Sequence, residues 1–105
     1  MENNYLKKKI QTIINNFNAK KFAYVISKSS SYLKKFPQTV ILYNLLGSSY
    51  QNIGEYNKAT DVFIKGLELD SNNIAIKNNL ATCYKYLLQY EDAENLYREI
   101  IEINP

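Results

Sequence analysis

The chain has 105 residues, of which 46% are hydrophobic and 22% charged, and its net charge is +3. This composition is that of one small globular domain and excludes disordered and fibrous classes. Histidine is absent and cysteine occurs once, which excludes histidine-based catalysis, histidine metal sites, an internal disulfide and a cysteine cluster for zinc. We therefore expect no metal and no other cofactor.

Three features of the sequence bear on its cellular setting. The start of the chain, Met1–Lys9, has no apolar core behind its lysines, so we do not expect a secretory signal. No stretch approaches the roughly 18 apolar residues that span a bilayer. The single unpaired cysteine, Cys83, is usual in a reducing compartment. We expect a cytoplasmic protein with no membrane partner.

Charge is distributed unevenly along the chain. Residues 1–39 hold eight lysines and one acid, a net charge of +7, whereas residues 40–105 hold five basic and nine acidic residues, a net charge of −4. A basic segment attracts acidic proteins, nucleic acids and membrane surfaces. This one has no arginine for bidentate base contacts and no glycine-rich phosphate loop, so we interpret its lysines as solvated helix faces and do not expect nucleic-acid binding.

Apolar residues recur at helical spacing along the whole chain, with no sustained alternation of the strand type. Two apolar faces precede Pro37, two more lie on either side of Gly54, and two follow the polar break at Asp70–Asn73. Gly54 fits a left-handed residue just past a helix end, and the polar break supplies helix-capping side chains. The loops are short enough to make consecutive helices antiparallel. The pattern predicts an all-α fold of about six helices.

A shift of 34 places superimposes the two later helix pairs on each other. Small residues fall on small ones and aromatic residues on aromatic ones, as Gly47 falls on Ala81 and Phe63 on Tyr97. Identical residues meet at Asn44 and Asn78, Leu46 and Leu80, Tyr50 and Tyr84, Tyr56 and Tyr90, Ala59 and Ala93, and Glu68 and Glu102. A helix–turn–helix unit with this period and these residues resembles the tetratricopeptide repeat (TPR). The resemblance implies a right-handed superhelical solenoid of antiparallel helix pairs.

The resemblance covers nearly the whole chain as one domain, residues 1–105, with units at about 1–37, 38–71 and 72–105. Small residues such as Gly47 and Gly66 let helix axes approach closely, and aromatic residues fill the gaps between them. The first unit is degenerate, because Ile13, Val25 and Tyr32 stand where the family has small residues. Its helical pattern survives, so we expect a helix pair there and leave its packing open.

In similar proteins, the first helix of each unit lines a concave groove that grips peptides. The corresponding faces here carry amides, hydroxyls, one lysine and one tyrosine, which hydrogen-bond a peptide backbone without selecting a charge. The candidate groove residues are Asn44, Ser48, Gln51, Asn52, Asn78, Thr82, Lys85 and Tyr86. The alternative interpretation is a plain solvated helix face.

One known form of this groove is not expected here. Chaperone-binding members of the family capture a terminal carboxylate with lysine, asparagine and arginine side chains at set places. The matching positions in this chain are Ile10, Ile14, Leu45, Ala75 and Asn79. Only Asn79 keeps a suitable polar type, so the resemblance does not extend to the carboxylate clamp.

Catalytic patterns are weak. Ser31–Lys34 matches the S-x-x-K pattern of serine acyl enzymes, but the partner motifs are missing. The acidic start of the last helix, at Glu91, Asp92 and Glu94, is explained by the helix dipole. Cys83 fits a small core residue, and without histidine it is a poor nucleophile. We do not expect an enzyme.

The sequence therefore favours a non-catalytic scaffold that binds a protein or peptide segment in the concave groove. The alternative, also implied by the resemblance, is the substrate-presenting or dimerising arm of a larger bacterial enzyme such as a glycosyltransferase or sulfotransferase. The last helix adds a further possibility, because we expect its apolar side chains to lie uncovered. These side chains are Leu96, Ile100, Ile101 and Ile103. Either the chain is a piece of a longer array, or this end packs on a second copy and supports self-association.

Overall fold

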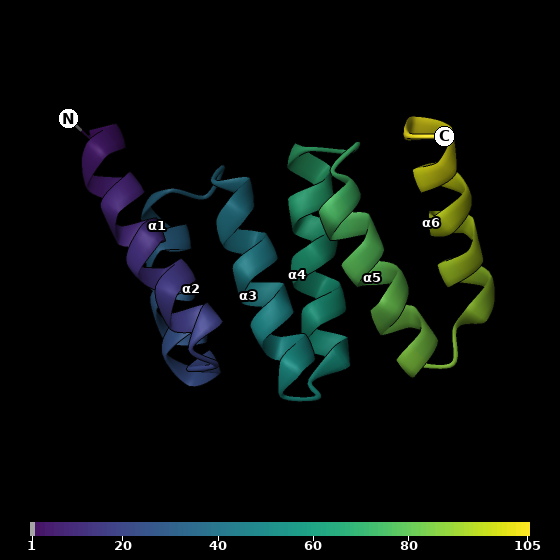
Figure 1. The fold of residues 1–105 in the computed structure, drawn as a ribbon, viewed down its shortest axis with the longest axis horizontal. Helices are drawn as coiled ribbons and strands as arrows, with labels where there is room; N and C mark the ends of the chain where they lie inside the picture. Colours follow the sequence, from purple (N-terminus) through teal and green to yellow (C-terminus); the bar gives the residue numbers. More distant parts are fainter. Residues whose placement is uncertain (1) are drawn as a thin grey trace.

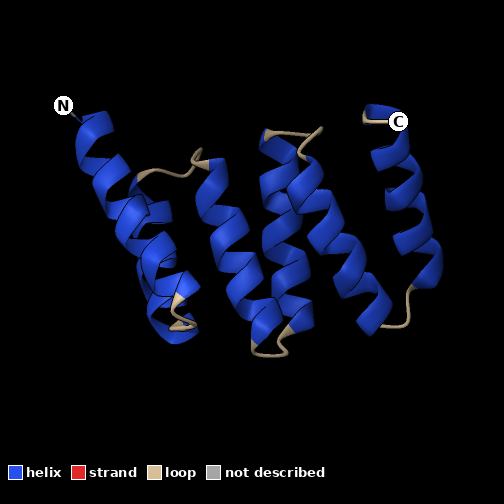
Figure 2. Cartoon of the chain, in the orientation of Figure 1, coloured by secondary structure: helices blue, strands red, loops and turns tan. Residues whose placement is uncertain are grey.

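The computed structural model describes residues 2–105, which form six α-helices joined by short turns, with no strand in that range (Figures 1 and 2). The expected all-α class is confirmed. The helices are α1 (Glu2–Asn18), α2 (Phe22–Lys35), α3 (Val40–Asn52), α4 (Tyr56–Leu69), α5 (Ile74–Tyr86) and α6 (Tyr90–Ile103).

The 34-residue period holds for the bounds of α2 to α6, and α1 ends 34 places before α3 ends but begins earlier than the period requires. α2, α4 and α6 begin and end at intervals of 34, and so do α3 and α5. The turn inside each pair contains one residue with positive φ, namely Lys20 at 62°, Gly54 at 82° and Leu88 at 62°. Gly54 was predicted from its residue type. The other two adopt the same left-handed conformation with a side chain, so the turn geometry repeats even where the residue type does not.

The helices form two layers in a solenoid, with the chain termini at opposite ends (Figure 1). The molecule measures 42 × 26 × 21 Å along its principal axes. Each helix packs against the next in sequence; in addition, α1 contacts α3 and α3 contacts α5, whereas α2, α4 and α6 do not contact one another. The first helices of the units therefore form a continuous inner layer, and the second helices are spread apart on the outside.

Local polar contacts fix the loops between units and one helix pair. The Asn73 Oδ1 accepts from the Ile76 amide at 3.0 Å and caps α5, as the polar break before this helix predicted. The Tyr43 hydroxyl donates to the Pro37 carbonyl at 2.6 Å and holds the preceding loop against α3. In the last unit, the nearly buried Lys77 ammonium pairs with Glu99 at 2.7 Å and joins α5 to α6.

Close helix approach depends on glycine at two places. A Cβ at Gly47 would lie 2.5 Å from the Phe63 ring, so α3 crosses α4 at a distance that only glycine permits. A Cβ at Gly66 would lie 2.9 Å from the Ile76 side chain and 3.2 Å from the Tyr43 Cβ. Phe63 is fully buried as a result. The predicted role of both glycines in packing is confirmed.

In the first unit, the large and the small residue of the Gly47–Phe63 pair exchange helices. Ile13 stands in the register position of Gly47, and Ser29 stands in that of Phe63; both are buried. The larger residue on α1 is thus matched by a smaller one on α2. This exchange explains how a unit without the family's small residues still forms a helix pair. It leaves the Ser29 hydroxyl buried without a hydrogen-bond partner.

The apolar end of the chain is only partly exposed. Leu96 is 8% exposed and belongs to the core cluster around Phe63 and Leu80, so its expected exposure was wrong. It lies three residues after the buried Ala93, on the side of α6 that faces α5. Ile100 is half-buried, whereas Ile101 and Ile103 are exposed as expected.

We predict that Gly47→Ala lowers the free energy of unfolding by about 1–3 kcal/mol, because the added methyl group overlaps the Phe63 ring. Urea denaturation followed by circular dichroism measures the change. Phe63→Leu in the Gly47→Ala background should cost less than the sum of the two single changes. Additive costs would contradict a direct overlap.

For the first unit, we predict that Ser29→Ala raises the free energy of unfolding by up to about 1 kcal/mol, since it removes an unpaired buried hydroxyl. Ile13→Ala serves as the matched change on α1 and should lower the same quantity by about 2–5 kcal/mol. A Ser29→Ala variant that is clearly less stable than the parent chain would show that the hydroxyl has a partner.

Candidate functional site

Two neighbouring hollows lie where α3 and α5 end. The first has a volume of about 320 Å³ and is lined by Thr82, Lys85, Tyr86 and Tyr90. The second, of about 420 Å³, is lined by Gln51, Asn52, Tyr56, Thr82 and Tyr86. The two share Thr82 and Tyr86, so together they form one continuous surface, the paired hollow. Five of the eight predicted groove residues line it: Gln51, Asn52, Thr82, Lys85 and Tyr86.

An aromatic pair, Tyr56 and Tyr86, lines the second hollow, and Tyr86 also lines the first. The rings of Tyr56 and Tyr86 stack with centroids 4.6 Å apart and an interplanar angle of 5°. Tyr86 is nevertheless 62% exposed, so it offers a large surface held in a fixed orientation. Tyr56 and Tyr90 were not predicted as site residues. Their 34-residue relation was visible, but it indicated packing and gave no sign of an open surface beside the rings.

The remaining predicted residues are used mainly within the fold. The Asn79 side-chain amide donates to Asn44 Oδ1 at 3.0 Å and to Ser48 Oγ at 3.3 Å. The Gln51 amide donates in turn to the Asn79 carbonyl at 3.5 Å. These bonds join α3 to α5 and rigidify the inner layer next to the hollows. Asn78 is exposed and lines neither hollow.

Lys85 supplies the positive charge of the site. It is exposed, lines the first hollow and forms no salt bridge with residues 4–105. Beside it stand the Thr82 hydroxyl, which donates to the Asn78 carbonyl at 3.1 Å, and the two tyrosine rings. The hollow therefore combines aromatic faces, hydroxyls and one ammonium group. Such a surface suits a peptide segment with a ring or aliphatic side chain and a nearby acceptor.

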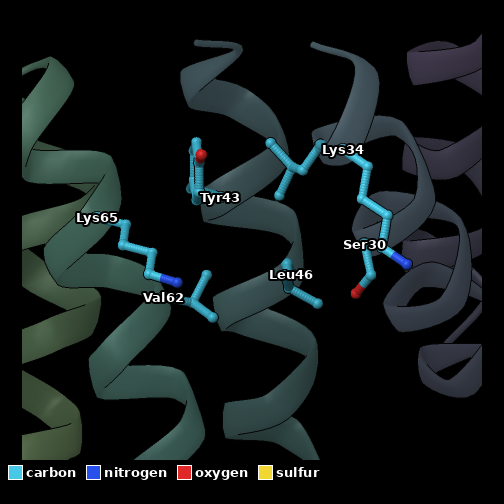
Figure 3. A pocket seen from close by; sticks show the side chains of 7 residues that line it. Ser30, Lys34, Tyr43, Leu46, Val62 and Lys65 are labelled. Atoms are coloured by element: carbon cyan, nitrogen blue, oxygen red, sulfur yellow. The ribbon is translucent and has the colours of Figure 1, made fainter. Parts of the chain in front are cut away.

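A third hollow lies elsewhere, between the outer helices α2 and α4 and over α3 (Figure 3). Its volume is about 280 Å³. Figure 3 shows Lys34 and Lys65 on opposite sides of the hollow, with Tyr43 and Leu46 of α3 between them and Val62 beside Lys65. Sequence reasoning missed this hollow because the two lysines come from different units and each looked like a solvated surface residue.

The single cysteine of the chain lies in the core. Cys83 is fully buried, and this burial raises the pKa of its thiol from 9.0 to about 11, which confirms its place in the core. Among the side chains of residues 4–105, no three histidine, cysteine or acidic groups come together in a way that would hold a metal ion. No helix there has the length and hydropathy to cross a membrane.

Comparison with known proteins identifies related sequences. A family model described as tetratricopeptide repeat matches residues 40–73 and 74–105, more than half of the chain. The protein ycf37 of Pyropia yezoensis is 32% identical over 63 residues, covering 60% of this chain and 35% of that protein. Its counterpart in Porphyra purpurea is 30% identical over 84 residues, covering 77% of this chain and 49% of that protein. The chain thus spans less than half the length of both relatives.

Solved structures share the fold at low sequence identity. PcrH in complex with the chaperone binding region of PopD has a TM-score of 0.92 at 17% identity, covering 98% of this chain and 77% of PcrH. The second TPR of Spaghetti (RPAP3), bound to the HSP90 peptide SRMEEVD, has a TM-score of 0.88 at 13% identity, covering 92% and 90%. A MamA RS-1 double mutant has a TM-score of 0.86 at 16% identity, covering 90% and 53%.

We predict that the free energy of unfolding decreases between about pH 9 and pH 11 through Cys83. In this window the unfolded chain loses its thiol proton while the folded chain keeps it, so the unfolded state is favoured as the pH rises. Urea denaturation across this range measures the effect. Part of the decrease should be missing in Cys83→Ala, and parallel pH profiles for the two proteins would contradict the assignment.

Proposed function

Because the chain belongs to the tetratricopeptide repeat family, we propose that it is a non-catalytic scaffold that holds an extended segment of a partner protein on its inner layer. The observation that carries the proposal is the paired hollow, where Thr82 and Tyr86 line both volumes. A segment lying across them would bury side chains on either side of Tyr86. The exposed amides of Asn52 and Asn78 on the inner layer offer hydrogen bonds to its backbone.

Two structural relatives support a peptide or protein ligand. PcrH was solved with a region of PopD, and the RPAP3 repeat domain with an HSP90 peptide. The residues at the positions of the family's carboxylate clamp differ from those that bind a carboxylate. Of the clamp positions only Asn79 is a suitable polar residue, and its side-chain amide already donates to Asn44 and Ser48. We therefore propose an internal segment of the partner as the ligand, with no requirement for its terminal carboxylate.

We propose that residues 1–105 act as one binding module of three units, at about 1–37, 38–71 and 72–105. The repeated turn geometry at Lys20, Gly54 and Leu88 supports these unit lengths. We place the module in a reducing compartment such as the cytoplasm, in accord with its single unpaired cysteine. No nucleic-acid ligand is proposed, because the paired hollow offers only one cation, Lys85.

A second candidate function is that of a substrate-presenting or dimerising arm within a larger enzyme. The length of the relatives supports this candidate, because the chain matches only 35% and 49% of them and so corresponds to one part of a longer protein in each case. The reading frame that follows Pro105 in the natural gene distinguishes the two functions. A downstream transferase domain would support the arm, and the inner layer would then hold a segment of that enzyme's substrate.

We predict that Thr82→Arg reduces partner binding at least about tenfold. Thr82 lines both hollows, so the longer arginine side chain would occupy space that the ligand needs. The partner segment is first mapped by cross-linking and mass spectrometry, and its synthetic peptide is then titrated by calorimetry. Asp61→Arg, an exposed change of similar size on α4, is the control and should leave the affinity unchanged. Equal affinity of both variants would rule out the paired hollow as the binding site.

A further inference from the structure

The 34-residue register relates two gaps on the outside of the array. One gap lies between α2 and α4 over α3, and the other lies between α4 and α6 over α5, because the outer helices do not contact one another (Figure 1). The third hollow lies in the first gap, and we name it the outer hollow. It is lined by Ser30, Leu33, Lys34, Tyr43, Leu46, Val62 and Lys65. The corresponding positions of the second gap show how the chain itself fills such a place.

In the second gap, an ion pair of the chain occupies the positions that correspond to the outer hollow. Lys77 of α5 stands 34 places after Tyr43 and is 5% exposed. Its ammonium group pairs with Glu99 of α6 at 2.7 Å, and Glu68 of α4 is the second acid in this register. The register thus assigns two acidic positions to one nearly buried cation.

The outer hollow has the opposite charge at both of these positions and no charge at the central one. Lys34 and Lys65 replace the two acids, and Tyr43 replaces the cation. The Tyr43 hydroxyl is already used, because it donates to the Pro37 carbonyl at 2.6 Å. Both lysines are exposed, and neither forms a salt bridge with residues 4–105, although Asp61 stands four places before Lys65 on α4. None of the seven lining residues is acidic, so the two cations lack the counter-charge that the second gap contains.

The rest of the outer hollow is apolar and offers few hydrogen-bond donors. Leu33, Leu46 and Val62 contribute aliphatic groups, and Leu46 belongs to the inner helix α3, so this apolar part is recessed between α2 and α4 (Figure 3). Every lining residue lies within a helix, where backbone amides bond to carbonyls of the same helix. The lining residues therefore offer none of the free amides with which proteins usually bind phosphate. Two ammonium groups beside aliphatic groups suit a carboxylate with an apolar neighbour.

We propose that the outer hollow binds a short acidic segment of a partner protein. An aliphatic side chain of the segment enters between α2 and α4, and carboxylates on either side of it pair with Lys34 and Lys65. The segment supplies the central counter-charge that Lys77 supplies in the second gap, with both signs of charge reversed. This site lies on the outside of the array and goes beyond the proposed function of the inner layer.

Size and shape favour a protein segment over a small molecule or a membrane. The volume of about 280 Å³ lies below the range of about 300–1,000 Å³ that is usual for pockets enclosing a whole small ligand, so it suits one or two inserted side chains. A flat membrane surface would meet the exposed lysines but would not reach the recessed Leu46.

The outer hollow is independent of the ends of the array and of the paired hollow. The three helices that line it, α2, α3 and α4, are consecutive and all present, and further repeats before α1 or after α6 would leave the gap between them unchanged. No lining residue is shared with the paired hollow, so the two sites can be occupied together.

The test uses the full 105-residue chain and, as the probe, the peptide Gly-Glu-Leu-Glu-Gly with acetylated and amidated ends. NMR spectroscopy follows the methyl groups of Leu33, Leu46 and Val62, and we expect their signals to shift on titration because all three line the hollow. A peptide with serine in place of leucine, or with glutamine in place of both glutamates, should bind several-fold more weakly.

A matched pair of double variants separates the site from general charge attraction. Lys34→Gln with Lys65→Gln should weaken the affinity for the glutamate peptide about tenfold, because each lysine pairs with a carboxylate. Lys35→Gln with Lys58→Gln removes the same charge from exposed lysines of the same two helices that do not line the hollow, and it should leave the affinity nearly unchanged.

Reversal of charge provides a second test. Lys34→Glu with Lys65→Glu reproduces the acids of the second gap. This variant should bind Gly-Lys-Leu-Lys-Gly with the same end groups and should lose affinity for the glutamate peptide. Because neither lysine forms a salt bridge with residues 4–105, the fold does not depend on their charge.

Several results would overturn the proposal. They are an absence of methyl shifts at millimolar glutamate peptide, equal affinities of the two glutamine double variants, and equal binding of the serine peptide. Displacement of the peptide by an equal concentration of succinate or inorganic phosphate would assign the hollow to a small anion. Binding of phosphatidylserine vesicles without binding of the peptide would assign it to a membrane, and self-association that Lys34→Gln with Lys65→Gln abolishes would assign it to a second copy.

Discussion

At the crossing of α3 and α4, the Phe63 ring occupies the space that any side chain at position 47 would require. This contact sets the distance between the two helices of the central unit. The other two units have different residue pairs at the same register positions. The third unit pairs Ala81 with Tyr97, and the first pairs Ile13 with Ser29. In each case the volumes on the two helices are complementary, as close packing demands. The inner layer, and with it the paired hollow, depends on this spacing.

Most of the fold could be predicted from the sequence because its signals are local and repeated. The 34-residue period, the left-handed Gly54 and the cap at Asn73 all follow from residue types at fixed spacing. The left-handed turns at Lys20 and Leu88 could not be predicted from their residue types, because register in the repeat determines them. The reversed pair in the first unit was also missed, since Ile13 was recognised as a departure from the family pattern but Ser29, its partner on α2, was not.

The candidate site was predictable in part. Helical periodicity placed Gln51, Thr82 and Tyr86 on the correct face, where they line the hollows. Periodicity does not tell which polar groups are already hydrogen-bonded, and so it treated Asn44 and Ser48 as available when Asn79 uses both. Nor does it show that an aromatic residue assigned to packing, such as Tyr90, keeps an open ring. Such distinctions depend on neighbours from another unit.

The separation of the outer helices determines the direction in which the array bends most easily. Since α1, α3 and α5 touch along the inner layer while α2, α4 and α6 do not, the array bends most easily by opening or closing the outer gaps. Such bending leaves every helix intact, because all backbone hydrogen bonds of a helix lie within it. Its stiffness comes from the side chains at each junction, among them the amide bonds around Asn79. A ligand on the inner face that contacts α3 and α5 together would therefore fix the curvature of the array.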